Sequence, residues 1–248
     1  MVVRRTEHLN TPLPNLPGMG EPLANRELQS TEAIARLEDV YPDATISLDF
    51  TNRLELLVAV ILSGQCTDER VNQETPALFE KYQTPEDYAE IDVDELADDI
   101  SSITYPNQKA GWISEACKLI VDEHGGEVPD TMEDLTDLPG VGRKTANVVL
   151  QHGHDLVEGI VVDTHVMRLS RRLGLTRETI RDKIEADLMG LVPEARWRDF
   201  THLLIAHGRE VCTARNPDCD DCVLEDICPS SQVDNEIDLA SGERWDER

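Results

Sequence analysis

The chain has 248 residues, and its 50 Asp and Glu against 23 Lys and Arg give a formal net charge of −27. Its length suits one large domain or two small ones. No apolar run reaches the ~18 residues of a membrane-spanning helix, and the first residues lack the apolar segment of a secretory signal. These features argue against membrane insertion and predict a cytoplasmic protein with reduced thiols.

The apolar pattern is helical along most of the chain. A start rich in Pro and Gly predicts an irregular arm over residues 1–28, and the acidic residues 230–248 predict a mobile tail. Residues 54–62 are apolar nearly all round, which predicts a buried central helix. Because no useful strand pattern occurs, the predicted fold class is all-α. We expect further helices at residues 68–81, 85–91, 93–100, 108–124, 131–138, 143–151, 164–173, 177–189 and 194–207.

Residues 138–146 have the sequence Leu-Pro-Gly-Val-Gly-Arg-Lys-Thr-Ala. Gly140 and Gly142 allow a tight reversal that leaves backbone N–H groups at the start of the next helix, and such groups bind phosphate. With Thr131 and Asp134 as start signals of the preceding helix, residues 131–151 predict a helix-hairpin-helix. The alternative is an ordinary helical hairpin whose glycines serve only packing.

Two charged residues favour a chemical role for this hairpin. Lys144 lies in the first turn of the second helix, where a cation opposes the helix dipole. A lysine amine attacks only in its neutral form, which requires desolvation or a neighbouring cation such as Arg143. Asp163 follows the apolar residues 160–162 and is a suitable carboxylate partner, although it also fits the N-cap of the next helix.

Four of the six cysteines lie in one short segment with the spacing Cys-x6-Cys-x2-Cys-x5-Cys. Four thiolates on a compact loop bind either a single tetrahedral zinc or an iron–sulfur cluster. Zinc usually takes two Cys-x-x-Cys pairs, whereas this segment has one. Cys66 and Cys117 lie in apolar helical patterns and are expected to be plain buried thiols. The candidate ligands are Cys212, Cys219, Cys222 and Cys228.

With these residues the chain resembles the endonuclease III family of bifunctional DNA glycosylases and abasic-site lyases, over about residues 32–229. Residues 138–146 match the family motif without change, and Val-Asp-Thr-His follows at residues 162–165. The resemblance implies that Lys144 is the catalytic amine and Asp163 the catalytic carboxylate of a base excision repair enzyme. It also implies that the four clustered cysteines hold a 4Fe–4S cluster.

The resemblance implies a two-lobed architecture as well. A six-helix domain would span residues 46–156, and a cluster-bearing domain would combine residues 29–45 with residues 157–229. The active site would lie in the cleft between them. The implied partner is double-stranded DNA with oxidised pyrimidines or abasic sites, which a monomer would bind at the nucleoid.

DNA contacts are expected at the two hairpin glycines and at several side chains. Gln65 resembles the family glutamine that fills the gap left by a flipped base, although it also fits a helix-end polar residue. Residues 102–110 depart from the family at Thr104 and Pro106, so opposite-strand intercalation and base preference are not carried over. Lys109 would contact phosphate or cover helix surface. The other expected contacts are Arg143, Arg168 and Arg215, of which Arg168 and Arg215 also fit solvated surface cations.

The negative charge is unusual for a DNA-binding protein, which generally has a basic face. A halophilic origin accounts for it, because surface carboxylates keep a protein soluble in concentrated salt. Two other functions stay open. One is an adenine-mismatch glycosylase, a family that lacks a lysine at position 144, and the other is a non-catalytic DNA-binding module with an iron–sulfur scaffold. Borohydride trapping on abasic DNA separates a lysine-dependent lyase from both.

Overall fold

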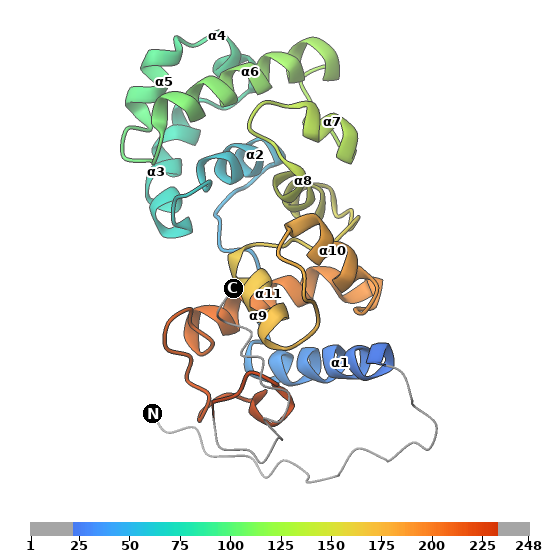
Figure 1. Cartoon of the computed structure of the whole chain (residues 1–248). Coiled ribbons are helices and arrows are strands. Elements are labelled where there is room, and N and C mark those ends of the chain that lie inside the picture. The colour runs from blue at the N-terminus through green and yellow to red at the C-terminus, as the bar shows by residue number, and fades with distance from the viewer. Residues whose placement is uncertain (1–21, 233–248) are drawn as a thin grey trace.

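The computed structural model describes residues 22–232, and all regular structure in that part of the chain is helical, as predicted (Figure 1). The helices form two lobes. No helix among the described residues is both long and apolar enough to cross a membrane. Residues 1–21 of the predicted arm and residues 233–248 of the predicted tail lie outside the described part.

The first lobe surrounds a buried central helix, α2 (Arg53–Leu62), in which every residue after Arg53 except Glu55 is buried. Seven α-helices make up this lobe, where the family resemblance implied six. Its core draws on residues 48–161, so the lobe is one continuous stretch of sequence. The helices that follow α2 are α3 (Asp68–Lys81), α4 (Pro85–Glu90), α5 (Val93–Asp99), α6 (Pro106–His124), α7 (Met132–Asp137) and α8 (Arg143–Val149).

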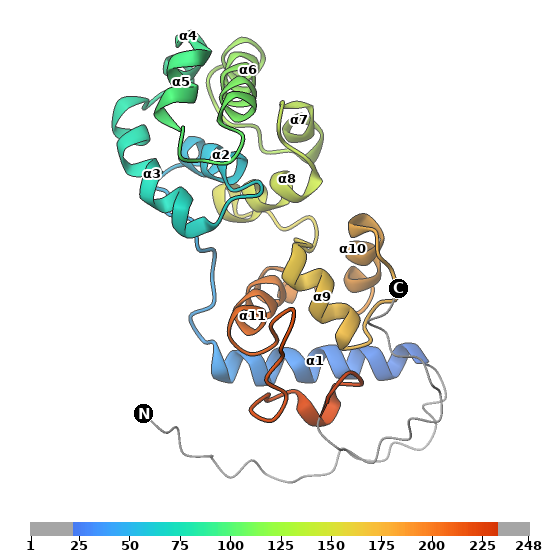
Figure 2. The ribbon, with the colours of Figure 1, turned by 60° about the vertical axis from the view of Figure 1, so that its left-hand side comes forward.

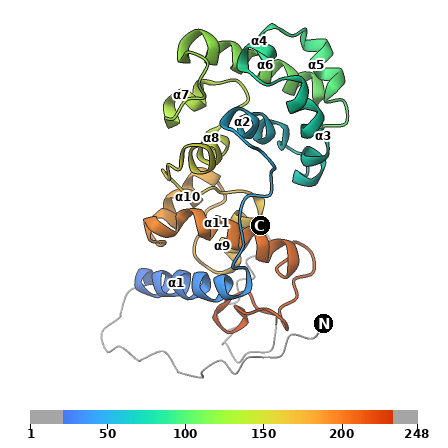
Figure 3. The ribbon, with the colours of Figure 1, turned by 180° about the vertical axis from the view of Figure 1, so that it is seen from behind.

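The second lobe combines distant parts of the sequence. Helix α1 (Pro22–Val40) packs beneath the C-terminal helices α9 (Thr164–Arg172), α10 (Arg181–Met189) and α11 (Trp197–Glu210) (Figure 2). A separate core joins the apolar face of α1 to residues between 160 and 224. The chain therefore passes between the lobes twice, and Figure 3 shows the connection from α1 to α2 clearly.

Helix α1 begins earlier than the sequence predicts. Residues 22–28, which were assigned to the irregular arm, are helical. The Arg26 guanidinium donates to the Leu175 carbonyl at 3.2 Å, and the Gln29 amide donates to the Ile227 carbonyl at 2.6 Å. These contacts with distant segments dock the start of α1 on the second lobe, which local composition could not indicate.

Helix α10 begins later than predicted, at Arg181 instead of Arg177. Thr176 explains the delay, because its hydroxyl donates to the Asp187 carboxylate at 2.5 Å and accepts the Glu178 N–H at 3.1 Å. A threonine hydroxyl that bonds nearby backbone in this way competes with helix formation.

Helix α8 also ends differently from the prediction for residues 143–151. After Val149 the chain widens into a π-helix, η1 (Leu150–His154), which ends at Asp155 with a left-handed φ of 57°. Such π-helical turns are rare and often occur at functional sites. Here the wider turn carries His152 towards the second lobe.

Candidate active site between the two lobes

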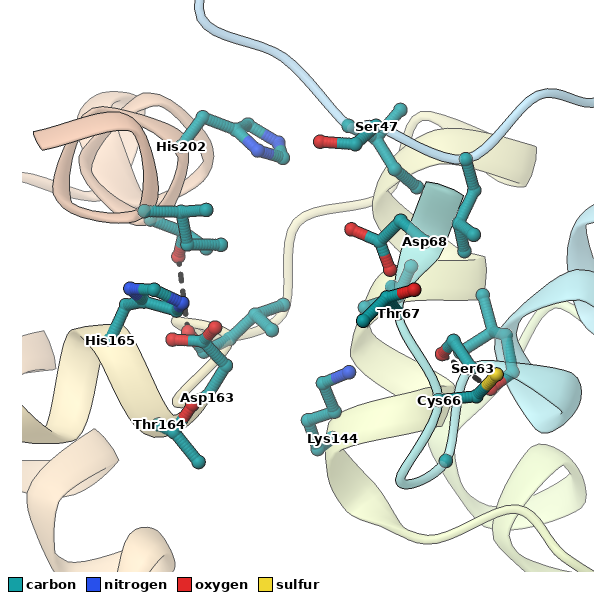
Figure 4. A pocket seen from close by; sticks show the side chains of 18 of the residues that line it. Ser47, Ser63, Cys66, Thr67, Asp68, Lys144, Asp163, Thr164, His165 and His202 are labelled. Atoms are coloured by element: carbon teal, nitrogen blue, oxygen red, sulfur yellow. Dashed lines mark hydrogen bonds between the residues drawn. The ribbon is translucent and has the colours of Figure 1, made fainter. Parts of the chain in front are cut away.

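A cleft of about 1280 Å³ lies where the two lobes meet. Its walls come from the loop after α2, the start of α3, the helices α8 and α11, and residues 161–165. In Figure 4, Lys144 on α8 and Asp163 at the start of α9 approach the same opening from different elements. The site therefore requires both lobes in their assembled arrangement.

Lys144 is the second residue of α8 and is exposed in the cleft. Its amine has no hydrogen bond or ion pair with any residue that the structure describes. Figure 4 shows the side chain extending into the open space. The amine is free to reach a bound molecule, and that molecule must supply the desolvation that this exposed position lacks.

Asp163 is the N-cap of α9, because its Oδ1 accepts the Val166 N–H at 2.7 Å. The preceding residues 160–162 are buried and fix the point where the carboxylate emerges. The N-cap prediction is therefore confirmed. It uses one carboxylate oxygen, and no hydrogen bond from the described residues engages Oδ2, which leaves that oxygen available to a substrate.

The hairpin before α8 separates the roles of its two glycines. Thr131 caps α7 by accepting the Asp134 N–H at 3.1 Å, as predicted. Gly140 has a φ of +80°, and a Cβ there would lie 3.0 Å from the Trp112 side chain. A Cβ on Gly142 would meet nothing within 4 Å. Packing against Trp112 thus explains why residue 140 is a glycine, but no packing contact explains the glycine at 142. Without a side chain at Gly142, the backbone at the start of α8 is uncovered.

Arg143 is held by a buried carboxylate of the other lobe. Its Nε and Nη2 donate to Glu185 of α10 at 2.7 and 3.0 Å, and the Asn147 amide donates to the same carboxylate at 3.0 Å. Glu185 is 4% exposed, and this carboxylate raises the pKa of Arg143. A Cβ on Gly159 would lie 2.1 Å from Glu185 Oε1, so only glycine fits beside the pair. The positive charge of Arg143, which we expected to act on Lys144, is therefore largely compensated by the Glu185 carboxylate.

Arg168 contacts the cysteine loop and does not line the cleft. Its guanidinium donates to the carbonyls of Gly208 and Cys212 at 2.9 and 3.0 Å, and burial lowers its pKa. One turn later, Arg172 donates to Cys212 Sγ at 3.2 Å and to the Thr213 carbonyl at 2.8 Å. The two arginines tie α9 to the loop that follows α11.

The four clustered cysteines are half-buried in the loop of residues 212–228. Burial raises the pKa of Cys222 and of Cys228 to about 11 each, and the other thiols of the loop add to this effect. The Leu224 N–H donates to Cys222 Sγ at 3.4 Å. Such crowded sulfur atoms with N–H donors around them suit metal-bound thiolates, whose charge a metal compensates.

The cysteine loop fits a cluster of several irons. Among the described residues, no three Cys, His, Asp or Glu side chains converge closely enough to hold one metal ion. A four-iron cluster is held by four Cys thiolates, the number that this loop offers. Outside this loop, Cys117 is buried as predicted, and burial raises its pKa to about 12. Cys66 differs from the prediction, since it is half-buried and lines the cleft.

Two contacts that join the lobes across the cleft had no signal in the sequence. His152 of η1 and His202 of α11 have their Nε2 atoms 3.1 Å apart. Burial lowers the pKa of His152 to about 4 and also lowers the pKa of His202. Arg209 of α11 donates to Ser47 Oγ and to Asp68 Oδ2, both at 2.7 Å. No spacing rule pairs residues that lie 50 or 141 positions apart.

Gln65 lines the cleft from the loop between α2 and α3. Beneath this loop, Lys109 is 2% exposed and its Nζ donates to the carbonyls of Leu62 and Gly64 at 2.8 and 2.6 Å. Both predictions for Lys109 were wrong, because its ammonium is buried at the negative end of α2. Arg215 is exposed, and no described residue forms a hydrogen bond or ion pair with it.

The comparisons with known proteins first define a class. Residues 58–194 match the family described as the HhH-GPD superfamily of base excision DNA repair proteins, and residues 212–228 match the iron–sulfur binding domain of endonuclease III. The first match contains both Lys144 and Asp163, and the second begins at Cys212 and ends at Cys228. The chain is a base excision DNA repair protein of the helix-hairpin-helix class.

Individual relatives narrow this class. The chain is 50% identical over 211 residues to endonuclease III of Synechocystis sp., a match that covers 85% of this chain and 96% of that protein. It is 40% identical over 197 residues to endonuclease III of Escherichia coli, covering 79% and 93%. The structure of a non-covalent endonuclease III–DNA complex has a TM-score of 0.79 and 42% identity, covering 82% of this chain and 95% of that one. The chain belongs to the endonuclease III family and carries a 4Fe–4S cluster.

Proposed function

We propose that this DNA glycosylase and abasic-site lyase acts on oxidised pyrimidines, with Lys144 as its nucleophile and Asp163 as its carboxylate. The enzyme removes the damaged base and then cuts the strand at the abasic site. One observation carries the residue assignment: an amine without a partner and a carboxylate with one free oxygen line the same cleft. Folding explains the capping oxygen of Asp163, but it explains neither its free oxygen nor the unpaired amine of Lys144.

Base removal begins when the neutral Lys144 amine forms a bond to C1′ of a nucleotide turned into the cleft. The N-glycosidic bond breaks, its electron pair leaves with the base, and the base takes up a proton. Positive charge develops on the sugar during this step, and the Asp163 carboxylate stabilises it. An electrostatic group of this kind accelerates a reaction by roughly 10² to 10³.

Strand cleavage follows from the covalent adduct. The sugar ring opens as O4′ takes up a proton, and the bond between C1′ and the Lys144 nitrogen becomes an imine. Removal of a proton from C2′ leaves an electron pair that forms the C2′–C3′ double bond, while the 3′ phosphate departs with the electrons of its bond to C3′. Asp163 Oδ2 is suited to transfer these protons. Water then hydrolyses the imine and restores the amine.

DNA binding would combine backbone and side-chain contacts. The N–H groups beside Gly140 and Gly142 would donate to a phosphate, since the start of α8 is uncovered. Gln65 would fill the gap left by the flipped nucleotide, and the unpartnered Arg215 would contact a phosphate. Arg143 and Arg168 would support DNA binding indirectly. Arg143 already donates to Glu185, and Arg168 already donates to the Cys212 carbonyl.

We assign the 4Fe–4S cluster to the thiolates of Cys212, Cys219, Cys222 and Cys228. When bound, the cluster supplies four strong iron–thiolate bonds that cross-link the loop. Two arginines of α9 position the loop: Arg168 and Arg172 donate to its carbonyls. Residues 213–218 of the loop hold Arg215 at the surface.

The charge of −27 indicates a protein adapted to concentrated salt, and we extend the proposal to a halophilic enzyme that works as a monomer at the nucleoid. Most of the protein's surface then repels DNA at low salt. Specificity would rest on base extrusion into the cleft more than on phosphate charge.

The experiment that tests this function is a panel of duplexes with oxidised pyrimidine, uracil, mismatched adenine or an abasic site, each incubated with and without borohydride. Oxidised pyrimidines should be excised and abasic DNA should be trapped covalently. Excision of mismatched adenine without trapping would favour a mismatch glycosylase, and absence of both activities would favour a non-catalytic module.

A further inference from the structure

The loop that carries Gln65 has an uncommon backbone conformation. Gln65 has a φ of 54°, in the left-handed region that non-glycine residues rarely adopt. Its side chain is exposed, and no hydrogen bond from it to the described residues accounts for this conformation. Within the loop, the Cys66 N–H donates to the Ser63 carbonyl at 3.0 Å and closes a turn around Gln65, and contacts from outside the loop add to this one bond.

Two side chains near the start of α6 hold this loop. The Thr104 hydroxyl donates to the carbonyl of Gln65 itself at 3.0 Å. The Lys109 ammonium donates to the carbonyls of Leu62 and Gly64. Three carbonyls within four consecutive residues are thus bound from one neighbouring segment. Ile103, next to Thr104, is 2% exposed and anchors that segment in the core.

Lys109 is a buried cation that the catalytic steps do not use. It has no carboxylate partner among the described residues, and burial lowers its pKa. A buried ammonium requires other acceptors, and the carbonyls at the C-terminal end of α2 supply them. This arrangement makes the loop and α6 one unit, because freeing the loop would leave the ammonium buried without acceptors.

We propose that Thr104 and Lys109 are positioning residues that hold Gln65 in the cleft before DNA arrives. The proposal rests on the proposed role of Gln65 in filling the gap beside a flipped nucleotide. A loop that already has its bound conformation loses less conformational entropy on binding.

The decisive variants are Thr104→Val, which removes the hydroxyl and keeps the shape, and Thr104→Ser, which keeps the hydroxyl. Thr104 is exposed, so neither change should affect folding. On a duplex with an oxidised pyrimidine, Thr104→Val should raise KM about threefold to tenfold, the effect of one hydrogen bond, with little change in kcat. Thr104→Ser should behave as the unchanged protein. Lyase activity on single-stranded abasic DNA, which has no gap to fill, should be the same in all three.

A double-mutant cycle with Gln65→Ala separates the possible outcomes. If Thr104 acts through Gln65, adding Thr104→Val to Gln65→Ala should change KM no further. Additive effects would overturn the proposal, because Thr104 would then act on DNA directly. A normal KM in Thr104→Val beside a raised KM in Gln65→Ala would overturn it too, while leaving the role of Gln65 intact. A normal KM in Gln65→Ala would overturn that role and this proposal together, without affecting the chemistry of Lys144.

Lys109 is tested by Lys109→Met, with Lys109→Arg as the variant that keeps a cation. Lys109→Met should raise KM on the duplex and lower the melting temperature, because it leaves the carbonyls of Leu62 and Gly64 without their donor. A fluorescent 2-aminopurine beside an abasic-site analogue reports extrusion directly. Its signal should fall in Lys109→Met and in Thr104→Val, and an unchanged signal in both would overturn the proposal.

Discussion

The two lobes are stabilised in different ways. The first is continuous in sequence and packs its helices around α2, which is buried along almost its whole length. The second combines α1 with distant helices and ends in the loop of residues 212–228. Within that loop, all of which the structure describes, Leu224 is the one buried apolar side chain. Arginine-to-carbonyl bonds hold this loop beside its partly buried apolar contacts with the second core, and the proposed cluster would cross-link it further.

This difference matters because the proposed catalytic pair draws on both lobes. The first lobe carries Lys144 on α8, and the second lobe carries Asp163 at the start of α9. The contacts that place these groups relative to each other are polar, and they join Arg143 to Glu185, Arg209 to Asp68 and His152 to His202. The geometry of the proposed site therefore depends on polar contacts between two lobes that each have a separate core.

The largest effect is expected on the first-lobe side of the cleft. Lys144→Gln should abolish borohydride trapping on abasic DNA, because an amide nitrogen cannot form the imine. DNA binding and the melting temperature should change little, since Lys144 has no hydrogen bond or ion pair with described residues. The matched control is Lys118→Gln, which removes an exposed lysine of the same lobe away from the cleft. Undiminished trapping by Lys144→Gln would exclude Lys144 as the nucleophile.

The next effect concerns the second-lobe side. Asp163→Asn should slow base release in single-turnover assays by about 10² to 10³, the loss of one electrostatic group. Asparagine is as good an N-cap as aspartate, so the melting temperature should hardly change. Asp163→Ala should lose activity and in addition about 1 kcal/mol of stability from the missing cap. A full rate in Asp163→Asn would leave Asp163 with its capping role alone.

Removing one cluster ligand should affect the second lobe and spare the first. The protein should contain about four irons with matching sulfide, and Cys219→Ser should lose most of them. The loop should then loosen and DNA affinity should fall, while α2 and the first core melt as before. Cys66→Ser is the matched control, because Cys66 lies outside the loop. Equal iron loss in both variants would contradict the ligand assignment.

The same comparison explains what the sequence could predict. Helix α3 was predicted with its observed ends, because its threonine N-cap, Thr67, is a local signal. The starts of α1 and α10 were missed. Arg26 acts through a partner far along the chain, and Thr176 acts through side-chain hydrogen bonds that compete with the helix. At the site, the motifs predicted Lys144 and Asp163 as candidates. Glu185 and His202 carry no motif and reach the site only through folding.

Salt should have a moderate effect on both lobes. With a net charge of −27, the carboxylates repel one another unless ions screen them, and the screening length falls from ~10 Å at 0.1 M to ~3 Å at 1 M. Melting temperature and lyase activity should therefore rise from dilute buffer towards molar potassium chloride. The exposed pair of Arg209 and Asp68 opposes this trend, but such pairs contribute only about 0 to 1 kcal/mol. A protein that is most stable and most active in dilute buffer would rule out the halophilic origin.

The smallest effect should appear at the histidine contact between the lobes. Burial holds the pKa of His152 near 4, whereas an unfolded histidine has a pKa of ~6.5. Above pH 6.5 His152 is neutral in both the folded and the unfolded protein, so its protonation costs the folded protein no stability there. As the pH falls from 6.5 towards 4, the unfolded chain takes up a proton that the folded protein refuses, and the free energy of unfolding decreases.

At pH 5 this decrease should be about 1 to 2 kcal/mol, after allowance for the part of the ring that faces the cleft. His152→Gln removes the titrating group and keeps a polar side chain near His202, so its stability should fall less between pH 7 and pH 5. Urea unfolding at the two pH values measures the difference, with His124→Gln as the control at a histidine away from the cleft. If the unchanged protein and His152→Gln lose stability in parallel, the contact with His202 does not depend on neutral rings. Because the two histidines belong to different lobes, the predicted loss should appear first as opening of the cleft, with both cores still folded.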